Sequence, residues 1–151
     1  MEYLKENDDY IEPIIYTSAL QPYNKHIMNI LDPHQEIFKT ILYQNACYLF
    51  EIKEEKILFM IKDISRFQNR DIRRMVLLDS KPTNFMMTPE NCMPVFEYTA
   101  EYSSSEKNNM VDSHLLNIID EIEEIKDLED IRPALKERFG VRQILKNSKL
   151  I

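Results

Sequence analysis

The sequence contains very little glycine: Gly140 is the single glycine among 151 residues. Glycine lets the backbone approach a phosphate closely, because it has no Cβ. One glycine therefore excludes the Walker phosphate loop and the dinucleotide-binding fingerprint. It also excludes the Gly-x-Ser-x-Gly turn that presents a nucleophilic serine. A protein of this composition would have to bind phosphate with side chains and ordinary turns.

Cysteine and histidine are also scarce. Cys47 and Cys92 are too few for a four-cysteine zinc site, and His26, His34 and His114 show no zinc-ligand spacing beside them. We therefore predict no zinc site in this chain. Two reduced, partly buried thiols in an intracellular protein are the interpretation that this cysteine content favours.

The charge balance and the hydrophobic pattern exclude further classes. The chain has 19 basic and 26 acidic residues and a formal net charge of −7, which disfavours direct binding to nucleic-acid phosphates because each contact needs a cation. No apolar run approaches the roughly 20 residues of a membrane span. The acidic start lacks the pattern of a signal or transit peptide. We therefore expect neither direct nucleic-acid binding, nor a membrane span, nor a targeting segment in this chain.

The first two thirds of the chain alternate between short apolar runs and polar segments. The runs at 11–16 and 75–78 are continuous, as in strands that are buried on both faces of a parallel sheet. We expect a hairpin of 47–52 and 56–61 joined by Lys53-Glu54-Glu55. The other elements expected here are the end of a helix at 1–7, a helix at 22–31, a strand at 36–43, and brief extended pieces at 85–87 and 94–96.

The last third has a different character. A polar, serine-rich loop is expected at 97–109, followed by amphipathic helices at 111–125 and 129–139, and Gly140 stands where a left-handed helix cap is expected. No repeat or long linker divides the chain, so we expect one domain over 1–141 and a basic, frayed tail over 142–151. The helix at 111–125 has an apolar stripe of Leu115, Ile118, Ile119, Ile122 and Ile125, and its acidic residues Asp120, Glu121, Glu123 and Glu124 form either a solvated face or a binding surface.

The two buried runs end in polar side chains. Thr17 and Ser18 follow the first run, and Asp79 and Ser80 follow the second. Ligands of parallel α/β sheets bind at the carboxyl ends of the strands, so these side chains could form a phosphate or metal site. The alternative is that Thr17 caps the next helix and Asp79 opens a turn. From composition alone, we favour this alternative.

Five segments, in order, resemble one known family. The sequence is similar to the FCP-homology domain of the RNA polymerase II carboxy-terminal-domain (CTD) phosphatases, in the haloacid dehalogenase superfamily. The similarity covers roughly residues 1–141, including a closing helix with Glu129-Asp130-Ile131-Arg132-Pro133. It implies an α/β, Rossmann-like parallel sheet with a β-hairpin insertion. The matching segments are Tyr16-Thr17-Ser18-Ala19-Leu20-x-x-Tyr23, Leu31-Asp32-Pro33, Lys62-Asp63-Ile64-Ser65 with Arg70-Asp71, Val76-Leu77-Leu78-Asp79-Ser80, and Thr88-Pro89-Glu90-Asn91.

The resemblance implies a role for four of these residues. The family binds Mg²⁺ beside the transferring phosphoryl group, whose charge the metal and a lysine offset. Thr17 occupies the position of the phosphoryl-binding hydroxyl, Lys62 that of the lysine, and Asp79 that of the fourth-motif aspartate. Ser80 occupies a metal-ligand position that is usually asparagine. A serine hydroxyl is a poorer ligand for a hard cation, so we expect a degenerate magnesium position at Asp79 and Ser80.

The first family motif is absent from the chain. The family's Asp-x-Asp-x-Thr supplies the nucleophile and the general acid–base, on a strand upstream of the helix with which this sequence begins, and no Asp-x-Asp occurs here. We therefore expect the sheet to lack its first, nucleophile-bearing strand. An aspartyl-phosphate cannot form without that carboxylate. The leading hypothesis is a truncated or degenerate phosphoserine/threonine phosphatase, inactive as this polypeptide.

Two alternatives remain open. The chain could be a fragment of an active Mg²⁺-dependent phosphatase, with the first motif about 35 to 45 residues upstream of Met1, an interval of one strand, a long loop and part of a helix. Features such as Lys62-Asp63-Ile64-Ser65 and Asp79-Ser80-Lys81 instead resemble the phosphatase-like receptor subunit of the mitochondrial presequence translocase. We expect a phosphoprotein or protein partner, in the nucleus or the mitochondrion respectively. The incomplete sheet, with Ile14, Ile15, Val76 and Leu78 poorly covered, also predicts self-association.

Overall fold

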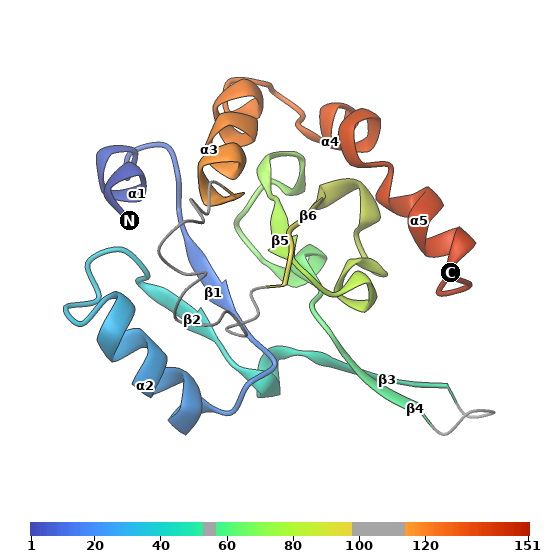
Figure 1. Cartoon of the computed structure of the whole chain (residues 1–151), viewed down its shortest axis with the longest axis horizontal. Coiled ribbons are helices and arrows are strands. Elements are labelled where there is room, and N and C mark those ends of the chain that lie inside the picture. The colour runs from blue at the N-terminus through green and yellow to red at the C-terminus, as the bar shows by residue number, and fades with distance from the viewer. Residues whose placement is uncertain (53–56, 98–113) are drawn as a thin grey trace, which may run out of the picture. The chain divides into compact units, whose positions relative to one another are not determined.

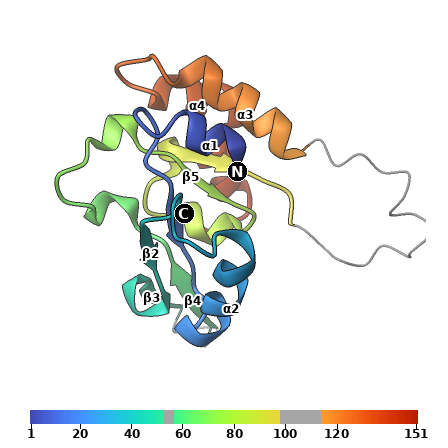
Figure 2. The same cartoon turned by 90° about the vertical axis from the view of Figure 1, so that its left-hand side faces the viewer.

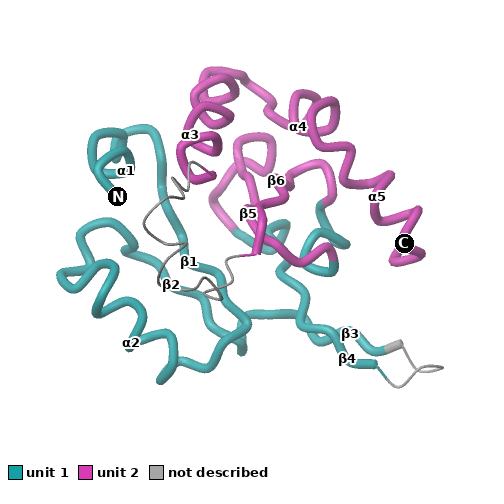
Figure 3. Tube along the Cα trace, viewed as in Figure 1, with its two compact units in different colours: residues 1–67, 83–88 teal, residues 68–82, 89–151 magenta. Residues whose placement is uncertain are grey.

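The computed structural model describes residues 1–52, 57–97 and 114–151. The chain divides into two compact units (Figure 3). The first contains residues 1–67 and 83–88, and the second contains residues 68–82 and 89–151. Two regions named in the sequence predictions lie largely outside the described residues: the turn at Lys53-Glu54-Glu55, and the loop at 97–109 together with the first three residues of the helix expected from 111.

A pair of parallel strands organises the first unit. Strand β1 (Ile14–Tyr16) pairs with β2 (Thr40–Leu42), with Ile14 opposite Thr40 (Figure 1). Helix α2 (Gln21–Leu31) connects them, so the three elements form a βαβ unit. Helix α1 (Glu2–Glu6) precedes β1. Strand β1 is half as long as the apolar run at 11–16 that predicted it. Pro13, which cannot donate a ladder hydrogen bond, lies immediately before the first residue of β1.

Asp32 determines where β2 begins. Its carboxylate accepts hydrogen bonds from the backbone N–H groups of Glu36, Ile37 and Phe38, at 2.9 to 3.0 Å. The residues that follow α2 are therefore held in a turn, and the strand expected from residue 36 starts only at Thr40. These hydrogen bonds lower the pKa of Asp32, and the hydrogen bond from the Phe38 N–H has the largest effect.

The predicted hairpin is confirmed. Strand β3 (Tyr48–Ile52) pairs with β4 (Ile57–Ile61) in antiparallel register, and Phe50 lies opposite Phe59. Figure 1 shows the pair of strands extending away from β1 and β2. Ile61, at the base, is fully buried. Four large apolar side chains of the hairpin are exposed instead: Tyr48, Leu49, Ile57 and Leu58.

A second parallel pair lies in the second unit. Strand β5 (Leu77–Asp79) pairs with β6 (Cys92–Pro94), with Leu77 opposite Cys92. The strand expected at 75–78 therefore starts two residues later, and the extended piece expected at 94–96 starts two residues earlier. The prediction of an extended piece at 85–87 is wrong at Phe85. This residue ends a 3₁₀ turn (Pro82–Phe85), and it is 2% exposed.

Three helices cover the core of the second unit: α3 (His114–Ile125), α4 (Arg132–Phe139) and α5 (Val141–Asn147). Both views show α3 and α4 as neighbours (Figures 1 and 2), and Arg138 of α4 forms ion pairs with Glu121 and Glu124 of α3. The buried cluster consists of Met93, Ile118, Ile125, Ile131 and Leu135. Leu115, which was expected on the buried stripe, is 70% exposed.

Gly140 separates α4 from α5. Its φ of 54° lies in the left-handed region, as the sequence predicted for a helix cap. The frayed tail expected after it is wrong: α5 forms there, and Val141 and Leu145, four residues apart on one face of that helix, are buried. Among the described residues, no helix is both long and apolar enough to cross a membrane.

The structure confirms the α/β class, with parallel and antiparallel pairs. Within the described residues, β1 pairs only with β2, and β5 pairs only with β6. Ile14, Ile15 and Val76 are half-buried, and Leu78 is 37% exposed. These are the four side chains that an incomplete sheet was expected to leave poorly covered.

Candidate functional site

Thr17 lies directly after β1. Its backbone N–H donates to the carbonyl of Leu42, which extends the pairing with β2 by one residue. Its side-chain Oγ1 accepts a 3.1 Å hydrogen bond from the N–H of Ala19. A hydroxyl that accepts in this way still has its own proton to donate. The Thr17 side chain therefore stabilises the turn into α2 and retains a donor for a ligand at the carboxyl end of β1.

Tyr16 brings the segment of Thr17 close to the segment of Lys62. The Tyr16 hydroxyl donates a 2.7 Å hydrogen bond to the carbonyl of Ala46 and accepts one of 3.4 Å from the N–H of Asp63. Its ring packs edge-on against Phe67. Burial is the main cause that raises the pKa of Tyr16, so the hydroxyl stays protonated and available to donate. Two residues predicted for one site, Thr17 and Lys62, therefore each lie next to a member of this hydrogen-bonded pair.

Lys62 is positioned between β4 and a tight 3₁₀ turn (Ile64–Arg66). The buried carboxylate of Asp63 holds that turn, because its Oδ1 accepts hydrogen bonds from the N–H and the hydroxyl of Ser65, at 3.0 and 2.5 Å. Asp63 and Ser65 of the matching segment therefore have a structural role. They fix the backbone that carries Lys62.

Asp79 and Ser80 lie in the second unit, where β5 ends. The Asp79 side chain is 8% exposed, and its Oδ1 accepts a 2.8 Å hydrogen bond from the N–H of Lys81. Its carbonyl accepts from the N–H of Val95, which continues the pairing with β6. Asp79 thus opens a turn, as the structural interpretation of the sequence expected. Its part in phosphoryl chemistry stays a prediction.

The donors at this strand end fit a magnesium site poorly. Mg²⁺ requires near-octahedral oxygen ligands, and proteins usually supply one or two carboxylates. Asp79 and Ser80 offer one carboxylate, already engaged with Lys81, and one hydroxyl. Across the described ranges, no three His, Cys, Asp or Glu side chains gather as metal ligands would.

Sequence reasoning missed the role of Asn91, which is 3% exposed. Its Nδ2 donates to the carbonyls of Ile72 and Met75, at 2.6 and 2.8 Å. Asn91 therefore anchors the Thr88-Pro89-Glu90-Asn91 turn to the backbone that leads into β5. The only signal in the sequence was that this asparagine belongs to a segment resembling the family.

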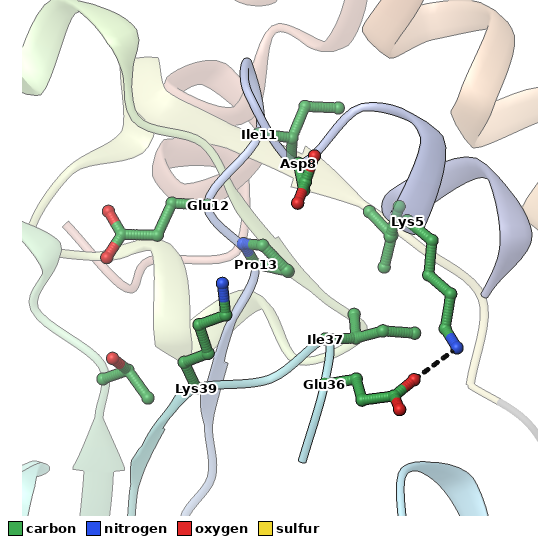
Figure 4. Close-up of a pocket in the computed structure, with 10 residues that line it drawn as sticks. Lys5, Asp8, Ile11, Glu12, Pro13, Glu36, Ile37 and Lys39 are labelled. Atoms are coloured by element: carbon green, nitrogen blue, oxygen red, sulfur yellow. Dashed lines mark hydrogen bonds and ion pairs between the residues drawn. The ribbon is translucent and has the colours of Figure 1, made fainter. Parts of the chain in front are cut away.

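The first unit also contains a cavity of about 320 Å³. Residues that precede β1 and β2 line it, including Asp8, Glu12 and Lys39, and the ion pair between Lys5 and Glu36 closes one side (Figure 4). The cavity therefore lies at the amino ends of the two strands. Thr17 follows the carboxyl end of β1, so this cavity is not the predicted phosphoryl site.

Comparison with known proteins identifies the family. The model of the NLI interacting factor-like phosphatases matches residues 1–132. The chain belongs to this family. The resemblance seen in the five sequence segments is thereby confirmed, and the fold is of the haloacid dehalogenase type.

Several curated relatives cover most of this chain. CTD small phosphatase-like protein 2 of Dictyostelium discoideum is 26% identical over 144 residues, which are 95% of this chain and 23% of that protein. The RNA polymerase II CTD small phosphatase 2 of Mus musculus is 29% identical over 134 residues, 89% of this chain and 44% of that protein. The mitochondrial import inner membrane translocase subunit TIM50 of Debaryomyces hansenii is 28% identical over 128 residues, which are 83% of this chain and 24% of that protein. The chain therefore spans less than half the length of these relatives.

Proposed function

We propose that this 151-residue chain binds phosphorylated protein segments and does not hydrolyse phosphomonoesters on its own. The observation that carries the proposal is the absence of Asp-x-Asp from the whole sequence. Covalent phosphoryl transfer in this family uses a carboxylate nucleophile from that motif. A chain without the nucleophile can still bind phosphate, because the residues that bind phosphate are not the nucleophile.

Thr17 and Lys62 are the residues that we propose for phosphoryl binding. The Thr17 hydroxyl keeps a proton to donate, and the Lys62 ammonium would attract the negative phosphoryl oxygens. The hydrogen bond from the Asp63 N–H to the Tyr16 hydroxyl supports this assignment, since it joins the residue before Thr17 to the residue after Lys62. Family members are generally Mg²⁺-dependent, and we propose that Asp79 and Ser80 form a degenerate metal position that binds Mg²⁺ weakly.

A binding measurement tests this assignment. A phosphoserine peptide and its unphosphorylated form are titrated with the chain by fluorescence anisotropy. We expect the phosphopeptide alone to bind, and Thr17→Ala and Lys62→Ala each to weaken it by about tenfold, the effect of one charge-assisted hydrogen bond. Lys39→Ala, at the opposite end of the strands, is the matched control and should bind as the wild type does. Equal binding of both peptides would refute the proposal.

A second candidate is an active phosphatase of which this chain is one part. Two observations favour it: the curated relatives are more than twice as long as the region matched here, and β1 pairs within the described residues only with β2. A strand that carries Asp-x-Asp-x-Thr could then complete the sheet. Adding such a peptide to the chain should generate Mg²⁺-dependent turnover. An Asp-x-Asp-x-Thr upstream of Met1 in the reading frame would support this candidate, and a stop codon there would remove it.

A third candidate is a presequence-receptor type of function, favoured by the similarity to TIM50. An acidic face on α3 was the proposed surface for a cationic segment. Three of its carboxylates already have partners within the chain, because Glu121 and Glu124 pair with Arg138, and Glu123 pairs with Lys126. A cationic ligand would have to displace these partners, so this candidate ranks last. Localisation of the tagged protein only to the nucleus would rule this candidate out, and localisation to the mitochondrion would support it.

A further inference from the structure

Arg66 is an exposed cation near the residues proposed for phosphoryl binding. It ends the 3₁₀ turn (Ile64–Arg66) that follows Lys62 and Asp63. Within the described residues, no aspartate or glutamate forms an ion pair with its guanidinium. Several arginines of the second unit, in contrast, pair with carboxylates: Arg73, Arg132, Arg138 and Arg142. The charge of Arg66 is therefore available to a ligand.

The backbone that carries Arg66 is held in place on both sides. Before Arg66, the N–H of Asp63 donates to the Tyr16 hydroxyl, and the Asp63 carboxylate accepts hydrogen bonds from Ser65. After Arg66, the ring of Phe67 packs edge-on against the ring of Tyr16, with 6.3 Å between the ring centroids. The side chain of Arg66 therefore starts from a fixed point near the end of β1.

The guanidinium of Arg66 lies within electrostatic range of the Tyr16 hydroxyl. Burial has the largest effect on the pKa of this hydroxyl and raises it, while the positive charge of Arg66 acts in the opposite direction. Successive side chains of a strand point to opposite faces, so Tyr16 and Thr17 project in different directions. Arg66 would therefore meet a neighbouring residue of a bound segment rather than the phosphoryl group at Thr17.

We propose that Arg66 binds an acidic side chain next to the phosphorylated residue, so that the preferred ligand is a phosphoserine segment with glutamate or aspartate beside the phosphoserine. This inference rests on the proposed function, because it concerns the same site. A guanidinium presents a planar fork of N–H donors that matches a carboxylate. The net charge of the chain is −7, so an acidic segment depends on local cations such as Arg66 to bind here.

Fluorescence anisotropy of the full chain with two phosphoserine peptides tests this inference. The peptides are identical except that the residues on either side of phosphoserine are glutamates in one and glutamines in the other. Wild type should bind the glutamate peptide about fivefold more tightly, as one exposed charge pair allows. Arg66→Gln should bind the two peptides equally. The preference of wild type should shrink as the salt concentration rises from about 50 mM to 500 mM, because salt screens an exposed pair.

Lys39→Gln is the matched control. It removes an exposed cation of the same unit at the amino end of β2, and it should keep the preference for the glutamate peptide. Equal binding of the two phosphopeptides by wild type, or an undiminished preference in Arg66→Gln, would overturn the inference and leave phosphoserine binding intact. Failure of both phosphopeptides to bind would instead overturn the proposed function, and this inference with it.

Discussion

The hydroxyl of Tyr16, at the end of β1, donates a 2.7 Å hydrogen bond to the carbonyl oxygen of Ala46, thirty residues later in the chain. The Tyr16 hydroxyl oxygen also accepts a hydrogen bond from the N–H of Asp63. One phenol thus connects three segments of the first unit: the end of β1, the turn before β3, and the turn that follows Lys62. The segments proposed to bind phosphoryl groups are held together by Tyr16, whose hydroxyl is engaged with Ala46 and Asp63.

Replacing Tyr16 by phenylalanine should separate this positioning role from packing. The ring can still contact Phe67, but the hydrogen bonds to Ala46 and Asp63 are lost. We expect a loss of about 1 kcal/mol in the free energy of unfolding, or about 2 to 4 °C in the midpoint of thermal unfolding. Differential scanning calorimetry measures this. Tyr23→Phe, on an exposed side chain of α2, should change the midpoint little, and an equal effect at both positions would contradict the account.

Asn91 should be among the most sensitive polar residues of the second unit. Asn91→Ala leaves the carbonyls of Ile72 and Met75 without their amide donor, which should cost about 1 to 3 kcal/mol. Asn91→Asp should cost more, because a carboxylate would face two carbonyl oxygens. Urea denaturation measures both. Asn84 is the control: it is also buried, but its Oδ1 has no partner in the described structure, so Asn84→Leu should be nearly neutral. Similar losses at Asn84 and Asn91 would argue against this role.

Acid should destabilise the protein through Asp130. Its carboxylate accepts two hydrogen bonds from the Arg132 guanidinium, at 2.9 and 2.7 Å, and this pairing lowers the pKa of Asp130 to about 2. The unfolded value is about 3.9. The folded state therefore binds the proton less tightly, so the stabilisation is complete above about pH 4 and is lost as the pH falls toward 2.

NMR titration of the side-chain carboxyl carbons tests the Asp130 prediction. The midpoint for Asp130 should lie near 2 in the wild type and rise in Arg132→Gln toward about 4, the value of an unperturbed aspartate. The free energy of unfolding of Asp130→Asn should depend less on pH between about 4 and 2, the interval set by the two pKa values. A wild-type midpoint near 4 would show that the ion pair is not formed in solution.

Local patterns predicted the elements whose cause is local. The hairpin followed from two apolar runs on either side of a charged turn, and the cap at Gly140 followed from the position of the only glycine. Long-range contacts explain the failures. The Asp32 carboxylate accepts hydrogen bonds from the backbone of Phe38 and its neighbours, so β2 begins later than expected. Helix α5 forms because Val141 and Leu145 are buried, and the basic charge of this segment does not predict that burial.

The candidate site depended on resemblance rather than on pattern. Thr17 and Asp79 could be identified as polar residues that follow buried runs. The same residue types also stabilise ordinary turns, and in the structure both side chains accept hydrogen bonds within such turns. Lys62 had no local signal beyond its place after β4. Asn91 and Tyr16 act through hydrogen bonds to backbone 16 to 47 residues away, and composition and periodicity do not report such contacts.

The most direct test of the proposed function is turnover. The purified 151-residue chain is incubated with a phosphomonoester and Mg²⁺, beside an Asp79→Ala variant, and phosphate release is measured. Because the chain has no Asp-x-Asp, we predict that wild type and variant release phosphate at the same background rate. Release by the wild type that Asp79→Ala abolishes would show that this chain catalyses phosphoryl transfer, and would contradict the account.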